Sequence, residues 1–147
     1  MSKERTELTE DQYVLFQEEA EYWLDKFNLR NWEVYYGRIS DKEGEEGEGF
    51  ADCRADGVNR VACLRLALSY YSVDKLRFPR VIHKAAFHEV CELMLSDLRS
   101  TSRYAELETD AIVHEIIRRL EHTVFIPDWQ QRQTQGEQDH GKGRNEP

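Results

Sequence analysis

The segment from Pro79 to Leu98 constrains the fold more than any other part of the chain, because it is apolar around most of a helix. Its apolar residues include Val81, Ile82, Ala85, Ala86, Phe87, Val90, Leu93, Met94 and Leu95. A helix that is apolar on nearly every side must be covered on nearly every side. Pro79 suits the first turn, where the missing N–H is not needed. We therefore expect a central, buried helix around which the other elements pack.

Three ionisable side chains interrupt this apolar helix. His88 and Glu92 are four positions apart, so they lie on the same face, while Glu89 follows His88 and projects to one side. Burial of such groups costs free energy unless they have hydrogen-bond partners, water or a metal ion. The sequence His-Glu-x-x-Glu differs by one residue from His-Glu-x-x-His, the helical zinc motif in which both His bind metal and the Glu is the general base.

Two further helices are predicted on either side of the buried one. Residues 9–28 carry aromatic and aliphatic residues at helical spacing, and Thr9 with Gln12 forms a capping box at the start. Residues 105–122 form the last helix. Its core stripe consists of Ile112, Val113, Ile116, Ile117 and Leu120. Each of the two presents one apolar face, which indicates packing against the central helix or a sheet.

The remaining regular structure is a short sheet. Residues 32–39 alternate as a strand does, and residues 50–55 and 60–68 flank Asp56-Gly57, a strong hairpin signal. We expect a three-stranded antiparallel meander. The acidic, glycine-rich run 41–49 is interpreted as a solvated loop between strands, since it lacks the ligand spacing of a calcium loop.

These elements predict one α+β domain. Residues 1–8 are expected to be a flexible N-terminus and residues 9–127 the folded domain, closed by Pro127. Residues 128–147 are expected to be a disordered polar tail, because the chain from Gln130 onward has no aliphatic or aromatic residue.

A catalytic zinc site takes about three protein ligands and leaves one position for water. His114 lies near the middle of the last predicted helix, at the margin of its apolar stripe. If that helix packs beside the central one, His88, Glu92 and His114 form a set of two His and one Glu. Thermolysin-like zinc sites use the same ligand inventory.

Neighbouring residues suggest the remaining roles at such a site. Glu89, beside the ligands but not on the metal, is the candidate general base that takes a proton from zinc-bound water. Asp110 or Glu121 is expected to orient His114. Tyrosines that could donate a hydrogen bond to the transition state are Tyr70, Tyr71 and Tyr104. Nothing in the sequence selects one of them.

The arrangement resembles the small single-domain zincin-like zinc metallopeptidases, many of them carried by phages and prophages. The resemblance spans roughly residues 10–125 and rests on His88-Glu89-x-x-Glu92 together with the downstream helix that bears His114. Glu92 stands where most members have His. The resemblance implies a zincin-like fold, a zinc cofactor and a peptide or protein substrate. It also implies that the hairpin from Phe50 to Leu68 is a shelf for extended peptide.

Non-catalytic interpretations compete with this one. His88, Glu89 and Glu92 could form a buried hydrogen-bond network with Arg118 or Arg119, and the chain would then be a non-catalytic interaction protein with a structural metal or none. The other two histidines of the helical part, His83 and His122, are interpreted as hydrogen-bonded core residues.

A magnesium-dependent nucleotide pyrophosphatase of the helical kind is a third alternative. That class uses E-x-x-E on one helix, which Glu89 and Glu92 match, and E-x-x-D on the next. The second half fails, because Leu107 precedes Asp110 by three residues. The predicted strands also fit that class poorly.

The composition of the chain limits the classes of partner that it can bind. A net charge of -9 argues against a nucleic-acid surface, which needs clustered Lys and Arg. The charged N-terminal residues lack an apolar signal segment, and no apolar stretch approaches the length of a membrane span. The three cysteines show no C-x-x-C spacing and are interpreted as small buried residues. We expect a reduced, cytoplasmic protein, and the sequence does not indicate its oligomeric state.

Overall fold

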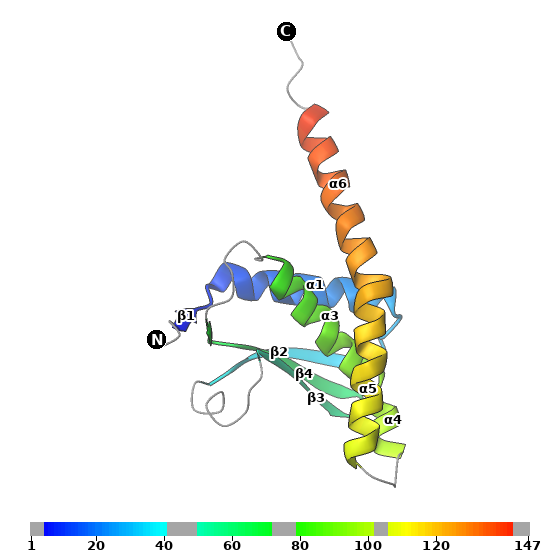
Figure 1. Cartoon of the computed structure of the whole chain (residues 1–147). Coiled ribbons are helices and arrows are strands. Elements are labelled where there is room, and N and C mark those ends of the chain that lie inside the picture. The colour runs from blue at the N-terminus through cyan, green and yellow to red at the C-terminus, as the bar shows by residue number, and fades with distance from the viewer. Residues whose placement is uncertain (1–4, 41–49, 72–78, 102–105, 143–147) are drawn as a thin grey trace.

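The computed structural model describes residues 5–40, 50–71, 79–101 and 106–142, and its architecture is α+β. Along the chain the elements are β1 (Arg5–Glu7), α1 (Glu10–Lys26), β2 (Glu33–Ile39), β3 (Ala51–Asp56), β4 (Val61–Ala67), β5 (Ser69–Tyr71), α3 (Arg80–Met94), α4 (Ser96–Thr101), α5 (Glu106–Leu120), the π-helical segment η2 (Glu121–Phe125) and α6 (Ile126–Lys142). Helices α1 and α3 lie side by side over one face of the sheet, and α5, η2 and α6 form a long rod past its end (Figure 1).

The three-stranded sheet is mixed and has the order β2-β4-β3. β3 and β4 form the predicted antiparallel hairpin, but β2 runs parallel to β4, from Glu33 opposite Val61 to Ile39 opposite Ala67. The antiparallel meander predicted for all three strands is therefore wrong. Side-chain burial explains the order. β4 buries alternate apolar side chains and suits the centre, whereas the exposed end of β3 suits an edge.

The predicted buried helix is confirmed, although it ends at Met94 and the short helix α4 follows it. Its side chains pack against α1, whose predicted capping box is present: the amide of Gln12 donates to Thr9 Oγ1 over 3.2 Å, and the Gln12 side chain accepts from the Thr9 amide over 2.9 Å. Trp23 of α1 meets Phe87 of α3 edge to face, with ring centroids 4.7 Å apart. Both rings are almost completely buried and form the centre of the core.

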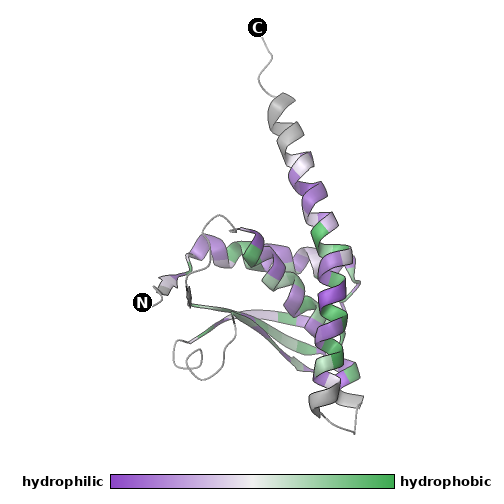
Figure 2. Ribbon diagram, viewed as in Figure 1, coloured by the Kyte–Doolittle hydropathy of each residue, from purple (hydrophilic) through white to green (hydrophobic). Residues whose placement is uncertain are grey.

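The chain after α5 differs from the prediction. The expected end near His122 and the disordered tail are replaced by η2 and then α6, which continues to Lys142. In the wide turn of η2 the amide of Ile126 donates to the Glu121 carbonyl. Pro127 follows, and because a proline inside a helix lacks an N–H, a π turn beside it accommodates the lost bond. As far as residue 136, the part of α6 that extends away from the sheet is hydrophilic (Figure 2).

The segment before α1 also differs from the expected flexible N-terminus. β1 pairs with β5, with Arg5 opposite Tyr71, and the amide of Leu8 donates to the Leu68 carbonyl over 2.8 Å. The Leu8 side chain is buried. The predicted loop 41–49 lies outside the described residues. In the described part of the chain, no helix combines the length and apolar character that a membrane crossing requires.

Candidate metal centre

His88, Glu92 and His114 come together where α3 passes α5. Glu92 Oε1 lies 3.5 Å from His88 Nε2 and 3.4 Å from His114 Nε2. One ligand atom from each of the three residues lies within 4.8 Å of the others. Ligands about 2.0–2.1 Å from a tetrahedral zinc ion are about 3.3–3.4 Å apart, so both nitrogen–oxygen separations fit such an ion. The group could hold a metal ion.

The Nδ1 atom of each imidazole already has an acceptor. His114 Nδ1 lies 2.9 Å from the backbone carbonyl oxygen of Asp110, and His88 Nδ1 lies 2.9 Å from Glu121 Oε1. Carbonyl and carboxylate oxygens only accept, so each Nδ1 carries the proton and the Nε2 of a neutral ring offers a lone pair. Two nitrogen lone pairs and a carboxylate oxygen then face one another. That arrangement requires a cation among them, either protons on the rings or a metal ion.

Charged side chains surround these three residues. Arg99 of α4 pairs with Glu92 Oε2, which leaves Oε1 facing the imidazoles, and Arg99 Nη2 lies 2.8 Å from Asp110 Oδ1. Lys84 Nζ lies 3.1 Å from Glu121 Oε2. Each carboxylate that touches a histidine of the group is therefore also held by a cation.

The same contacts set the protonation of the residues on α3. Burial alone would lower the pKa of His88, but hydrogen bonds to Glu121 and Glu92 outweigh it and raise this pKa to about 9. Burial alone would raise the pKa of Glu92, yet the bond from His88 and the charges of Arg99 and His114 lower it. Without a metal ion, His88 is therefore protonated at neutral pH. A bound metal ion would replace that proton.

Glu89 is separate from the ligand group and lines a cavity of about 720 Å³ between β3 and α3. Phe50 and Ala51 form the strand side of the cavity, while His88 and Glu89 lie on its helix side. The Glu89 side chain is buried, which raises the pKa of its carboxyl group to about 8, and the nearby charge of Glu92 adds to the increase. His88 thus belongs both to the ligand group and to the cavity wall.

Of the two residues predicted to orient His114, Asp110 contacts His114 and Glu121 contacts His88. Asp110 lies beside His114 and contacts it mainly through the backbone carbonyl, since its carboxylate oxygen is 3.6 Å away. Glu121 orients His88 instead, because η2 turns its side chain toward α3. The predicted network to Arg118 or Arg119 is wrong: both are exposed and pair with Glu115.

Of the two histidines predicted to be hydrogen-bonded core residues, only His83 fits the prediction. His83 is hydrogen-bonded to buried Glu19 at 2.6 Å, as expected for a core histidine, whereas His122 is exposed. The side chains of Tyr70, Tyr71 and Tyr104 lie outside the described residues. The sequence interpretation missed Arg99, although it follows Glu92 by seven positions, a spacing that returns to the same side after two helical turns.

Comparisons of the chain with protein-family models, with curated proteins and with solved structures found no match. The features of the chain that point to a function are the group of His88, Glu92 and His114, the buried Glu89 and the adjoining cavity.

Proposed function

We propose that the chain is a zinc-dependent peptidase with a zincin-like fold, in which His88, Glu92 and His114 hold the metal. One observation carries the proposal. The Nδ1 contacts to Glu121 and to the Asp110 carbonyl turn both Nε2 atoms toward Glu92 Oε1. Metal-binding histidines are commonly held in this way by an acceptor on the other ring nitrogen.

A zinc ion bound by these ligands would acidify a water molecule and make it a nucleophile at neutral pH. Glu89 would be the general base in this proposal: its ionised carboxylate would accept a proton from the attacking water molecule and later pass it to the leaving amine nitrogen. Burial makes the ionised Glu89 carboxylate a stronger base than a surface glutamate, and the positive charge of a bound zinc ion would favour this ionised form at neutral pH. Glu121 keeps His88 in the tautomer that binds metal.

The cavity supports a peptide as the substrate. β3 is hydrogen-bonded to β4, and among the described strands no other pairs with it, so its second edge can accept an extended chain. Phe50 and Ala51, at the start of this edge, line the cavity opposite Glu89. A peptide paired with the edge would pass close to both Glu89 and His88.

The deciding experiment combines metal analysis with a peptide-library cleavage assay on the full chain. We expect about one zinc ion per chain in the wild type. Glu89→Gln should retain the metal and lose cleavage, since the amide cannot accept the proton. Glu115→Gln is the matched control, because Glu115 is exposed on the outer side of α5. A wild-type protein that takes up no zinc from a buffered solution would refute the proposal.

The pairing of Arg99 with Glu92 favours a second candidate, a non-catalytic interaction protein whose His/Glu/Arg network is structural. A guanidinium group beside the ligand carboxylate already neutralises part of its charge, and a proton on His88 completes the network without metal. Zinc bound with full occupancy, together with no cleavage that Glu89→Gln abolishes, would favour a structural metal on this second candidate.

A further inference from the structure

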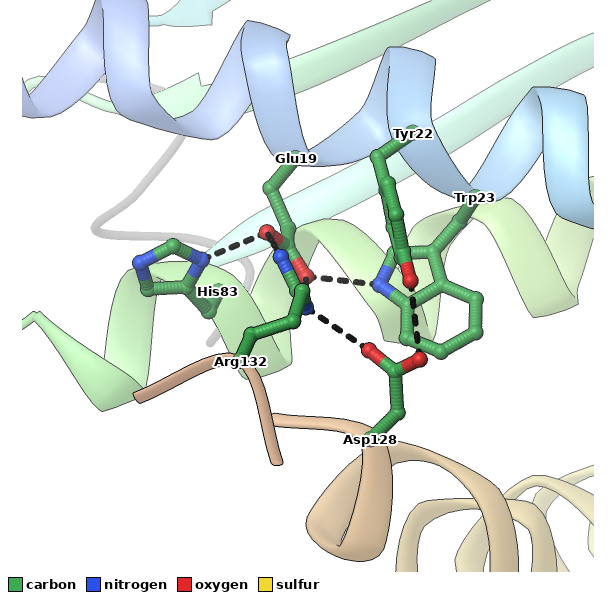
Figure 3. A network of polar contacts seen from close by, with 6 residues as sticks. All are labelled: Glu19, Tyr22, Trp23, His83, Asp128 and Arg132. Atoms are coloured by element: carbon green, nitrogen blue, oxygen red, sulfur yellow. Dashed lines mark hydrogen bonds and ion pairs between the residues drawn. The ribbon is translucent and has the colours of Figure 1, made fainter. Parts of the chain in front are cut away.

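A second buried polar cluster lies near the start of α3 and is centred on Glu19 of α1 (Figure 3). The Glu19 side chain is 2% exposed. Its carboxylate accepts from Trp23 Nε1 over 2.7 Å and contacts His83 Nδ1 at 2.6 Å. Arg132 of α6 donates to both Glu19 oxygens, over 2.6 and 3.0 Å. α1, α3 and α6 are therefore joined at one carboxylate.

Arg132 is itself held in a fixed orientation. Its Nε donates to Asp128 Oδ2 over 2.7 Å, and its guanidinium carbon lies 4.2 Å from the centre of the Tyr22 ring. The Tyr22 hydroxyl donates to the other oxygen of Asp128 over 2.8 Å. A planar guanidinium that is bonded in two directions and stacked on a ring has one permitted orientation. The start of α6 thus cannot rotate against α1 without breaking several of these bonds.

The same rod carries two residues of the candidate metal centre. α5, η2 and α6 follow one another without a break, with His114 on α5, Glu121 at the start of η2 and Arg132 on α6. Apolar contacts also hold the rod: Val113 and Ile117 of α5 are fully buried, and the ring of Phe125 packs 5.3 Å from that of Phe87. Apolar contacts of this kind tolerate small rotations, whereas a two-pronged ion pair does not. The contact of Arg132 with Glu19 is therefore a directional restraint on the rod's rotation.

We propose that Arg132 is a positioning residue for the metal centre: by clamping Glu19 it fixes the rotation of the α5–η2–α6 rod and so holds Glu121 against His88. The inference rests on the proposed metal site, because the effect of Arg132 is measured as a change in zinc affinity. Arg132 contacts Glu19, Asp128 and the Tyr22 ring, so its influence on the metal can pass through the rod or, by way of Glu19 and His83, along α3. Only the route through the rod depends on Glu121.

The test is zinc affinity in a double-mutant cycle on the full chain. Arg132→Gln should weaken zinc binding by up to about tenfold, the lower end of the range for loss of a group that orients a metal ligand. Glu121→Gln should weaken it by a similar factor. In the Glu121→Gln background, Arg132→Gln should add almost nothing, because the route through Glu121 is already lost. Arg132→Lys keeps the positive charge but loses the two-pronged contact with Glu19. We therefore expect its zinc affinity to lie between those of wild type and Arg132→Gln.

Two controls separate positioning from general loss of stability. Arg119→Gln changes an exposed arginine of the same rod and should leave zinc affinity unchanged. Leu8→Ala destabilises the core far from the rod and should lower the melting temperature without the coupling to Glu121. Wild-type protein that binds zinc while Arg132→Gln binds it equally well, or an Arg132 effect that is undiminished in the Glu121→Gln background, would overturn the inference. Absence of zinc binding in the wild type would instead refute the metal site itself.

Discussion

His114 Nδ1 lies 2.9 Å from the backbone carbonyl oxygen of Asp110, one helical turn earlier on α5. Because a backbone carbonyl cannot donate, this contact assigns the ring proton to Nδ1 whenever the imidazole is neutral. The free lone pair then points at Glu92 Oε1, 3.4 Å away. Helix α5 itself, independently of any side-chain partner, thus prepares His114 to act as a ligand.

Replacing His114 tests the ligand group directly. We expect His114→Ala to lose stoichiometric zinc, because two remaining ligands do not make a zinc site. Wild-type protein at a free zinc concentration of 100 times the dissociation constant should gain about 2.7 kcal/mol of stability, and the variant should gain almost none. Thermal melting with and without zinc measures the difference. His122→Ala, a change at an exposed histidine further along the same rod, should behave like wild type.

Arg99→Ala removes the cation that pairs with buried Glu92. Because Arg99 is itself 35% exposed, the loss should be smaller than for a fully buried pair, about 1–2 kcal/mol in the free energy of unfolding of the metal-free protein. Zinc should recover much of that loss, since the ion supplies the missing positive charge. Urea denaturation in the presence of a chelator and again with zinc measures both effects. Arg118→Ala, at an exposed arginine, should change stability by less than about 0.5 kcal/mol.

The Glu19 network makes the free energy of unfolding depend on pH in the acidic range. Burial alone would raise the pKa of Glu19, but bonds from His83 and Arg132 outweigh it and lower this pKa to about 2, against 4.5 for an ordinary glutamate. A carboxyl group whose pKa is lower in the folded state stabilises above the unfolded pKa, and the contribution disappears as pH falls from about 4.5 to about 2. The shift corresponds to about 3 kcal/mol.

Urea midpoints measured between pH 5 and pH 2.5 test this dependence. Glu19→Gln should be less stable than wild type at pH 5 but should lose less stability on acidification, because its side chain does not titrate. Parallel curves for the two proteins would contradict the assignment. Glu10→Gln, at an exposed glutamate of the same helix, should leave the wild-type pH dependence intact.

Phe87 lies at the centre of the aromatic core. Its ring is fully buried and contacts Trp23, Phe27 and Phe125. Phe87→Ala should lower the free energy of unfolding by about 3–5 kcal/mol, because it leaves a cavity lined by three aromatic rings. Chemical denaturation measures the loss. Val58→Ala, at a side chain that is 93% exposed, provides the matched control and should be nearly neutral.

Local patterns were sufficient to predict α1, α3 and the β3–β4 hairpin, because capping, periodicity and a two-residue turn signal each act over a few residues. The parallel pairing of β2 with β4 could not be predicted in this way. The hairpin signal relates β3 to β4 only, and which edge β2 joins depends on burial across the whole sheet. The ligand group required one further assumption, that α5 packs beside α3, and the structure places His114 beside Glu92.

The C-terminal helix was missed for a different reason. From Gln130 onward no side chain is aliphatic or aromatic, so hydrophobic periodicity contains no information about that stretch. The relevant signal lies in α1, where Glu19 occupies a position on the apolar face between Phe16 and Trp23. A carboxylate at such a position requires a cation. The sequence alone does not show that Arg132, 113 residues later, is that cation.

The strand order has a consequence for how the chain folds. β2 is synthesised first, but its partner β4 is the last of the three strands and lies between the other two. The β3–β4 hairpin closes over a short turn and needs no other strand, so it is expected to form early. β2 is expected to pair only after that hairpin has formed. It then joins the edge of β4 opposite β3, which requires the slow closure of a long loop. Amides of β3 and β4 should therefore acquire protection from hydrogen exchange before those of β2 during refolding.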